Sequence, residues 1–246
     1  VSDSTRSRCP VRIMLDQSAP LHELTARRGR LEISFERDPA AFRGTGGLVS
    51  DLARDYDDDE WLLVATGSQF MSAPMGAIVA RLARAGGDVA LAADEQGNPA
   101  GLVLVRCACL REISHVGFVD LNEQALPMLA ARWDTRVVRG PEMASHSVRT
   151  RERYLEALRA YHRRGLGSGE SPEPWSEDWQ ATFRVIERGG SVSPKATVHD
   201  SVVLAGAQVE AGAVLVRSVV AGDAVVSAGQ THVGALVGAG GNVIDG

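Results

Sequence analysis

Aliphatic residues recur every five or six positions near the C-terminus, and this spacing constrains the fold more than any other feature of the chain. The recurring residues are Val192, Val198, Val203, Val209, Leu215, Val220 and Val226. Small residues separate them, as in the segment 210–213, which reads Glu-Ala-Gly-Ala. A six-residue period with one aliphatic residue per repeat is typical of a β-helix, in which each triangular coil takes three repeats. The sequence therefore predicts a short left-handed parallel β-helix over residues 191–240.

The predicted β-helix has only two to three coils, and its open ends expose unpaired strand edges. So short a stack cannot cover these ends by itself. We therefore expect it to pack against the preceding domain or against another subunit.

Residues 10–165 alternate between helical and strand patterns, which predicts an α/β domain with a mostly parallel sheet. The predicted strands include Val11–Leu15, Leu31–Phe35, Trp61–Ala65, Asp88–Ala93, Leu102–Val105 and Val137–Arg139. The predicted helices include Ala19–Arg28, Leu48–Tyr56, Met75–Ala85, Leu121–Trp133 and Arg151–Arg164. Trp61–Ala65 is a continuous apolar run, as in a strand buried on both faces. The turn at Thr66–Gln69 would then lie where open α/β sheets bind ligands.

Residues 166–190 are predicted to form a linker and a short docking helix. Trp175, Trp179 and Phe183 stand four residues apart, which favours the apolar face of such a helix over a ligand-binding aromatic box.

The net charge of −5, from 26 basic and 31 acidic residues, argues against nonspecific binding to nucleic acid or to a membrane surface. No apolar run approaches the length of a membrane span, and we expect a cytoplasmic protein. The three cysteines, Cys9, Cys107 and Cys109, lack the spacing of a zinc site. Lys195 is the single lysine, so residues 1–194 offer no ammonium group for catalysis.

Four stretches, in this order, resemble the sugar-phosphate nucleotidyltransferases, especially the mannose-1-phosphate guanylyltransferase type. Residues 42–48 (Phe-Arg-Gly-Thr-Gly-Gly-Leu) resemble that family's Leu-Gly-Thr-Ala-Gly loop, which lies against the nucleotide base. Residues 62–68 (Leu-Leu-Val-Ala-Thr-Gly-Ser) resemble its strand ending in Asn-Gly-Asp. Residues 118–127 resemble its Phe-Asp-x-x-x-x-x-Leu-Pro segment, and residues 147–157 its Asp-x-Gly-Thr-Pro-Glu-x-Tyr-Leu-x-Ala segment.

The resemblance implies an incomplete Rossmann-like nucleotidyltransferase domain followed by the β-helix. It implies residual nucleotide or sugar contacts at Gly44, Thr45, Gly46, Gly47, Thr66, Gly67, Ser68 and Asp120. The family's two metal-binding aspartates align with Ser68 and Ser147, and the family's Gly-Gly-x-Gly-Thr-Arg phosphate loop has no counterpart in the sequence. Two neutral hydroxyls do not replace two carboxylates as magnesium ligands, so we expect no catalytic residues and no metal cofactor.

The resulting hypothesis is a catalytically inactive homologue, a pseudoenzyme that acts as a regulatory or structural subunit or as a sugar-nucleotide sensor. It would form a homo-oligomer, or a hetero-oligomer with an active nucleotidyltransferase. One alternative is an active, magnesium-dependent nucleotidyltransferase completed by a missing N-terminal segment or a partner chain. Another is a hexapeptide acyltransferase, for which His199 and His232 are the candidate histidines.

Two local alternatives also stay open at this point. Asp120 faces a sugar pocket, or it caps the helix that begins near Leu121. Residues 57–60 (Asp-Asp-Asp-Glu) form a solvated acidic loop, or they bind a cation.

Overall fold

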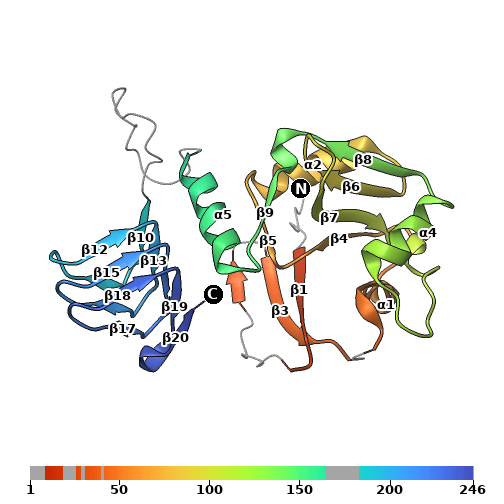
Figure 1. Cartoon of the computed structure of the whole chain (residues 1–246). Helices are drawn as coiled ribbons and strands as arrows, with labels where there is room; N and C mark the ends of the chain where they lie inside the picture. Colours follow the sequence, from red (N-terminus) through yellow and green to blue (C-terminus); the bar gives the residue numbers. More distant parts are fainter. Residues whose placement is uncertain (1–8, 19–25, 29–30, 40–41, 164–182, 246) are drawn as a thin grey trace, which may run out of the picture. The chain divides into compact units, whose positions relative to one another are not determined.

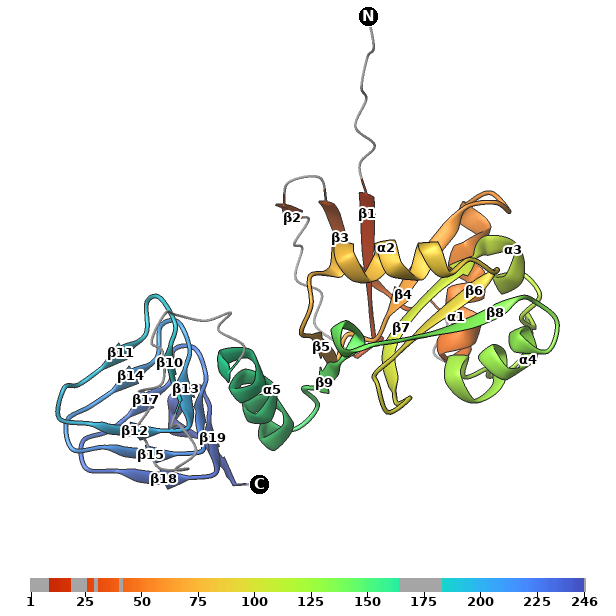
Figure 2. The same ribbon diagram turned by 90° about the horizontal axis from the view of Figure 1, so that it is seen from above.

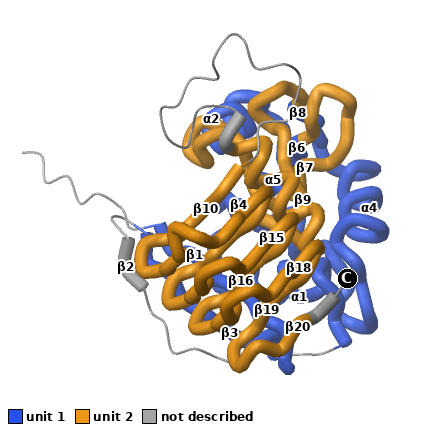
Figure 3. The backbone as a smooth tube through the Cα atoms, turned by 60° about the vertical axis from the view of Figure 1, so that its left-hand side comes forward, with its two compact units in different colours: residues 1–64, 79–92, 102–138 blue, residues 65–78, 93–101, 139–246 orange. Residues whose placement is uncertain are grey.

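A computed structural model describes residues 9–18, 26–28, 31–39, 42–163 and 183–245. Contacts divide the chain into two compact units, coloured in Figure 3. Unit 1 comprises residues 1–64, 79–92 and 102–138, and unit 2 comprises residues 65–78, 93–101 and 139–246. Trp175 and Trp179, which the sequence assigns to a docking helix, lie outside the described residues.

A three-stranded sheet opens the chain. β1 (Cys9–Leu15) pairs in parallel with β3 (Leu31–Arg37), and β2 (Ala26–Arg28) pairs antiparallel with β3. The predicted helix over 19–28 is therefore wrong for 26–28, and 19–25 lie outside the described residues. The reason is a strand pairing close in sequence, because the backbone of β2 pairs with β3, which begins at Leu31, instead of forming the hydrogen bonds of a helix.

A four-stranded sheet has the order β4-β7-β6-β8. Its strands are β4 (Trp61–Ala65), β6 (Val89–Ala93), β7 (Pro99–Arg106) and β8 (Thr135–Arg139). β7 runs opposite to β4, because the Thr66 N–H donates to the Gly101 carbonyl and the Cys107 N–H to the Glu60 carbonyl, both at 2.9 Å. The turn at 94–98 is too short for a crossover, so β6 and β7 also run in opposite directions. The α/β class is confirmed. The inner strand β7, however, runs opposite to its neighbours β4 and β6, and so departs from the parallel arrangement that we expected.

β4 is an edge strand, and the expectation that it is buried on both faces is wrong. Its burial alternates, with Trp61 43% and Leu63 36% exposed. Leu62 and Val64 pack instead against the main apolar cluster of unit 1. The sequence pattern misleads here because both faces of the strand carry apolar residues, although Trp61 and Leu63 on one face stay partly exposed.

The helices are α1 (Gly44–Leu52), η1 (Ala53–Asp55), α2 (Met75–Ala85), α3 (Cys107–Leu110), η2 (Leu121–Ala125), α4 (Leu126–Ala130), η3 (Pro141–Met143), α5 (Arg151–Arg163) and η4 (Ala239–Gly241). None of those in the described part of the chain has the length and apolar character needed to cross a membrane. α1, α3 and α4 contribute to the core of unit 1 together with strands β6 and β7. Burial in this core raises the pKa of the Cys109 thiol to about 11.

The C-terminal strands build a three-sided stack within unit 2 (Figures 1 and 2). They are β10 (Arg184–Ile186), β11 (Ser191–Val192), β12 (Thr197–His199), β13 (Ser201–Val203), β14 (Gln208–Val209), β15 (Val214–Val216), β16 (Val219–Val220), β17 (Val225–Val226), β18 (Thr231–Val233), β19 (Ala235–Val237) and β20 (Val243–Asp245). The three sheets have the orders β10-β13-β16-β19-β20, β11-β14-β17 and β12-β15-β18. All their pairings are parallel except β19 with β20. β10 begins before residue 191, within the range that the sequence assigns to the linker.

The recurring aliphatic residues line the interior of this stack. Val203, Val209, Leu215, Val220 and Val226 are buried in one cluster, and Val192 and Val198 pack against it. The chain returns to the same wall after 17 residues, as when Ser218 follows Ser201. Parallel strands on three walls around an apolar interior fit the expected β-helix.

The corner that leads from the β12-β15-β18 wall to the β10-containing wall explains why some repeats have five residues. One residue makes this turn, and its φ is positive in each coil: 46° at Asp200, 48° at Arg217 and 63° at Gly234. A single left-handed residue turns the chain without the longer connection used at the other corners. Each coil therefore has two repeats of six residues and one of five.

Two buried serines connect successive coils. The Ser218 N–H donates to the Ser201 hydroxyl oxygen at 3.0 Å, and the Ala235 N–H donates to the Ser218 hydroxyl oxygen at 3.1 Å. Both serine side chains are fully buried, and each hydroxyl also donates to a backbone carbonyl. These bonds satisfy the backbone N–H groups that follow the one-residue corners.

Helix α5 packs on the β10-containing wall of the stack, within unit 2. Leu155 of α5 lies in one apolar cluster with Phe183, Val202 and Val219. The Asp200 carboxylate accepts hydrogen bonds from Arg159 at 2.8 Å and from the Phe183 N–H at 3.2 Å. Phe183 is packed, but it lies directly before strand β10 and not in the docking helix that we expected. The stack packs against a helix of the preceding segment.

We predict that Ser218→Ala destabilises the stack by about 1–3 kcal/mol, because the buried Ala235 N–H loses its acceptor. The measurement is hydrogen exchange at the Ala235 amide together with urea unfolding. Ser227→Ala, at an exposed serine in a turn, is the matched control and should have little effect. Equal effects of the two substitutions would contradict the structural role given to Ser218.

Candidate functional site

The glycine segment at the start of α1 is held against the carbonyl of Val119. Gly44 has a φ of +70°, and a Cβ at this position would lie 2.5 Å from that carbonyl oxygen. The same oxygen accepts hydrogen bonds from the Gly46 N–H at 2.9 Å and the Gly47 N–H at 3.4 Å. The backbone N–H groups of two of the glycines predicted to contact nucleotide or sugar are therefore already used within unit 1.

Thr45 and Asp120 lie side by side and cap the next helical segment. The Thr45 hydroxyl donates to Asp120 Oδ2 at 3.2 Å and accepts from the Leu121 N–H at 3.0 Å. Asp120 Oδ1 accepts from the N–H groups of Asn122 at 2.8 Å and Glu123 at 2.9 Å. The hydrogen bond from Glu123, and next that from Asn122, lower the pKa of Asp120 below its usual 3.8. Of the two interpretations left open, the capping role of Asp120 is confirmed.

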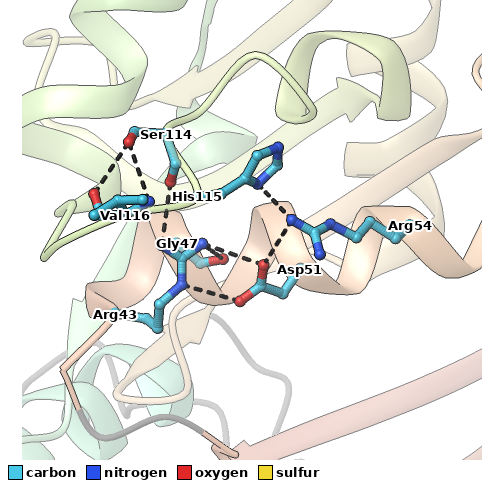
Figure 4. A network of polar contacts seen from close by, with 7 residues as sticks. All are labelled: Arg43, Gly47, Asp51, Arg54, Ser114, His115 and Val116. Atoms are coloured by element: carbon cyan, nitrogen blue, oxygen red, sulfur yellow. Dashed lines mark hydrogen bonds and ion pairs between the residues drawn. The ribbon is translucent and has the colours of Figure 1, made fainter.

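The loop after α3 is fixed to α1 by a polar network (Figure 4). The Arg43 guanidinium forms two hydrogen bonds with Asp51, at 3.0 and 3.1 Å, and reaches the Ser114 carbonyl at 3.2 Å. Arg54 contacts both Asp51, at 3.6 Å, and the His115 ring. A Cβ on Gly47 would lie 3.1 Å from the Arg43 side chain. The residues that resemble a base-binding loop thus have contacts that hold unit 1 together.

The two serines that align with metal-binding aspartates come together within unit 2. β5 (Gln69–Met71) pairs antiparallel with β9 (Ser145–Ser147), which places Ser147 opposite Gln69. The Ser68 carbonyl accepts from the Val148 N–H at 2.9 Å, so the two chain segments stay paired beyond the strands. Thr66, Gly67 and Ser68 form the turn between β4 and β5, and the Gln69 N–H closes it on the Thr66 carbonyl at 3.2 Å.

Arg149 lies against this pair of serines. Its Nε donates to the Ser68 hydroxyl at 3.0 Å, and its backbone N–H approaches the Ser147 hydroxyl at 3.5 Å. Sequence reasoning missed this residue, although the signal was available. In the matched segment, Arg149 stands where the resembled family has the glycine of Asp-x-Gly-Thr. The site therefore carries a positive charge and two neutral hydroxyls.

This chemistry does not fit magnesium, which prefers carboxylate oxygens and is repelled by a neighbouring guanidinium. Within the described ranges, no group of three or more His, Cys, Asp or Glu side chains is arranged to hold a metal ion. In the acidic segment 57–60, Asp58 pairs with Arg111, and the Glu60 carboxylate accepts from the Asp57 N–H. Two of its four acidic side chains therefore have partners within the protein.

The two histidines of the acyltransferase alternative occupy different positions in the stack. His199 is exposed and in register with Val216 and Val233. His232 is in register with Leu215, so it continues the interior column in the last coil. Both histidines lie in strands, β12 and β18.

An apolar pocket of about 310 Å³ lies elsewhere in unit 2. Its walls come from β5, α5 and the connection between β9 and α5, namely Phe70, Val148, Tyr154, Ala157, Leu158 and Tyr161. None of the residues predicted to contact nucleotide or sugar belongs to it.

The predicted contact residues thus form two groups. Gly44, Thr45, Gly46, Gly47 and Asp120 belong to unit 1, and Thr66, Gly67 and Ser68, with Ser147, belong to unit 2. The first group has internal structural contacts, whereas the second presents hydroxyl groups and a guanidinium.

Comparison of the sequence with protein-family models and with curated proteins finds no match. Among solved structures, the chain is similar to the crystal structure of HddC from Yersinia pseudotuberculosis, with 10% sequence identity and a TM-score of 0.46. The similarity covers 62% of this chain and 78% of HddC. A likeness at this level carries no conclusion about function.

We predict that Asp120→Ala costs about 1 kcal/mol of stability at pH 7, the usual effect of losing a helix cap. Because the pKa of Asp120 is lowered in the folded state, the ionised carboxylate stabilises the fold above its ordinary pKa of 3.8. That contribution is lost as the pH falls through the lower folded value, so wild type and variant should converge in acid. Denaturant unfolding at several pH values measures this.

Asn122→Ala is the control, since the Asn122 side chain is exposed. A constant difference between Asp120→Ala and wild type from pH 7 down to strong acid would contradict the ionic cap.

Proposed function

We propose that the chain is a nucleotidyltransferase-like protein without nucleotidyl-transfer activity, acting as a sugar-nucleotide sensor or regulatory subunit. The observation that carries this proposal is the position of Arg149. Its guanidinium Nε lies 3.0 Å from the Ser68 hydroxyl oxygen, and its backbone N–H approaches the Ser147 hydroxyl. Nucleotidyl transfer of the resembled kind uses a metal ion to neutralise charge on the phosphates. Here the two aligned positions supply no negative charge, and the neighbouring residue supplies a positive one.

The contacts in unit 1 support the same proposal. The amides of Gly46 and Gly47 are bonded to Val119, and Asp120 is occupied as a helix cap. These amides and this carboxylate form hydrogen bonds that stabilise unit 1 itself. Loss of one electrostatic contact at a catalytic centre typically lowers a rate by about 10²–10³. Replacement of both carboxylates therefore favours a role in binding over one in turnover.

We further propose that the three-sided stack is a left-handed parallel β-helix that serves in assembly. Parallel pairing around an apolar interior supports this assignment. β20 covers the edge of β19, while the described residues add no strand to the edges of β17 and β18. Unpaired strand edges are suited to contact another subunit, a second copy or an active nucleotidyltransferase.

The purified chain should release no pyrophosphate from a nucleoside triphosphate and a sugar 1-phosphate in the presence of magnesium. The expected result follows from the missing metal ligands, and a coupled pyrophosphate assay measures it. Mannose 1-phosphate with GTP and glucose 1-phosphate with UTP are suitable substrate pairs. Stoichiometric pyrophosphate release would sink the proposal and restore the alternative of an active enzyme.

Magnesium binding should appear in a variant that restores the charge of the resembled site. Ser68→Asp/Ser147→Asp/Arg149→Gly supplies two carboxylates and removes the guanidinium, so titration calorimetry should detect Mg²⁺ binding that wild type lacks. The matched control, Ser68→Asn/Ser147→Asn/Arg149→Gly, removes the same positive charge without adding a negative one. Magnesium binding by wild type with the affinity of the restored variant would contradict the proposal.

A further inference from the structure

Arg149 is notable because no carboxylate among the described residues pairs with it. Many arginines of this acidic chain lie within 4.0 Å of a carboxylate, as Arg43 does with Asp51 and Arg159 with Asp200. Arg149 instead donates through Nε to the neutral hydroxyl of Ser68. Its two terminal nitrogens have no hydrogen-bond or ion-pair partner among the residues that the structure describes, and the side chain is exposed.

The contact with Ser68 determines which part of Arg149 is available. Because Nε is engaged, the side chain is anchored through the inner edge of the guanidinium. Antiparallel pairing of β5 with β9 and the bond from the Val148 N–H to the Ser68 carbonyl fix the backbone on both sides. The backbone and Nε of Arg149 are thus fixed before a ligand binds. Binding through the terminal nitrogens then costs less side-chain entropy.

Space for a ligand lies above the neighbouring turn. A Cβ placed on Gly67 would have no atom within 4 Å, so the outer side of the turn is open. The hydroxyls of Ser68 and Ser147 are half-buried beside it, and each can donate a hydrogen bond after a rotation of its proton. A planar guanidinium with neighbouring hydroxyl donors is suited to phosphate oxygens.

We infer that Arg149, Ser68 and Ser147 bind a phosphate or diphosphate group without a metal ion. This rests on the proposed function in one respect, because it gives the sensor a way to hold the phosphates of a sugar nucleotide. The guanidinium supplies the positive charge that a magnesium ion would otherwise supply. The ligand is an anion with several oxygens, free or carried by a nucleotide sugar.

Titration calorimetry of the full chain in EDTA tests the inference with three probes: inorganic phosphate, pyrophosphate and GDP-mannose. Binding of pyrophosphate or GDP-mannose is expected without any divalent cation. Binding of pyrophosphate alone identifies a free inorganic anion as the ligand, whereas tighter binding of GDP-mannose identifies a nucleotide sugar. Failure of all three probes to bind would overturn the inference.

Arg149→Gln should weaken binding at least about tenfold, the usual scale for loss of a charge-assisted hydrogen bond. Arg153→Gln is the matched control, because Arg153 is exposed on α5 and pairs only with Glu156 at 3.4 Å among the described residues. The control should bind with wild-type affinity. An equal loss of anion affinity in both variants would show that binding depends on the net charge of the protein and not on Arg149, and would overturn the site.

Ser68→Asp gives a second, independent variant. Its carboxylate would pair with Arg149 and repel an anion, so phosphate binding should be lost while the melting temperature stays near that of wild type. Unchanged affinity in Ser68→Asp would also overturn the inference. These experiments measure anion binding and not pyrophosphate release. The proposed anion site can therefore be disproved while the proposed lack of nucleotidyl transfer stands, and the reverse also holds.

Discussion

Burial of one aliphatic side chain per strand holds the C-terminal stack together, and the rest of unit 2 depends on it. Leu215 and Val220 stand on successive walls and fill the same interior. The column requires that each coil return to its starting wall in register, which the one-residue corner at Asp200 and its equivalents accomplish. Asp200 then links this geometry to α5, since its carboxylate binds Arg159.

Buried hydrogen bonds are as restrictive as the apolar packing. Ser201 and Ser218 accept backbone N–H groups where the left-handed corners interrupt regular pairing. An unsatisfied N–H in such a position costs more than an average hydrogen bond contributes. The polar and apolar requirements thus select the same register.

The candidate site illustrates how charge decides between two uses of one backbone arrangement. Ser68 and Ser147 are brought together by β-pairing, as two metal ligands would need to be. Arg149 adds a positive charge beside Ser68, and this charge is the basis of the anion site that we propose. In unit 1, Asp120 is likewise committed, because its oxygens accept the N–H groups that start η2.

Predictions that depend on residues close together in the sequence were more accurate than those that depend on contacts between distant segments. α2 begins and ends where the spacing of its apolar residues and the following glycines predict. Trp61–Ala65 formed a strand as predicted, but its burial was wrong because sheet order is a long-range property. The wrong helix at residues 26–28 has a different cause, because β2 pairs antiparallel with β3, which begins at Leu31, and this local pairing was not recognised in the sequence.

The sequence by itself determined the aliphatic period of the stack, the alternation of helices and strands, and the absence of carboxylates at positions 68 and 147. These are properties of residue type and spacing. Tertiary structure alone decided that β4 pairs with β7, that the Val119 carbonyl accepts from the glycine amides and that Arg149 reaches Ser68. Each of these contacts joins residues that are distant in sequence, so no local pattern encodes it and only the folded backbone brings the partners together.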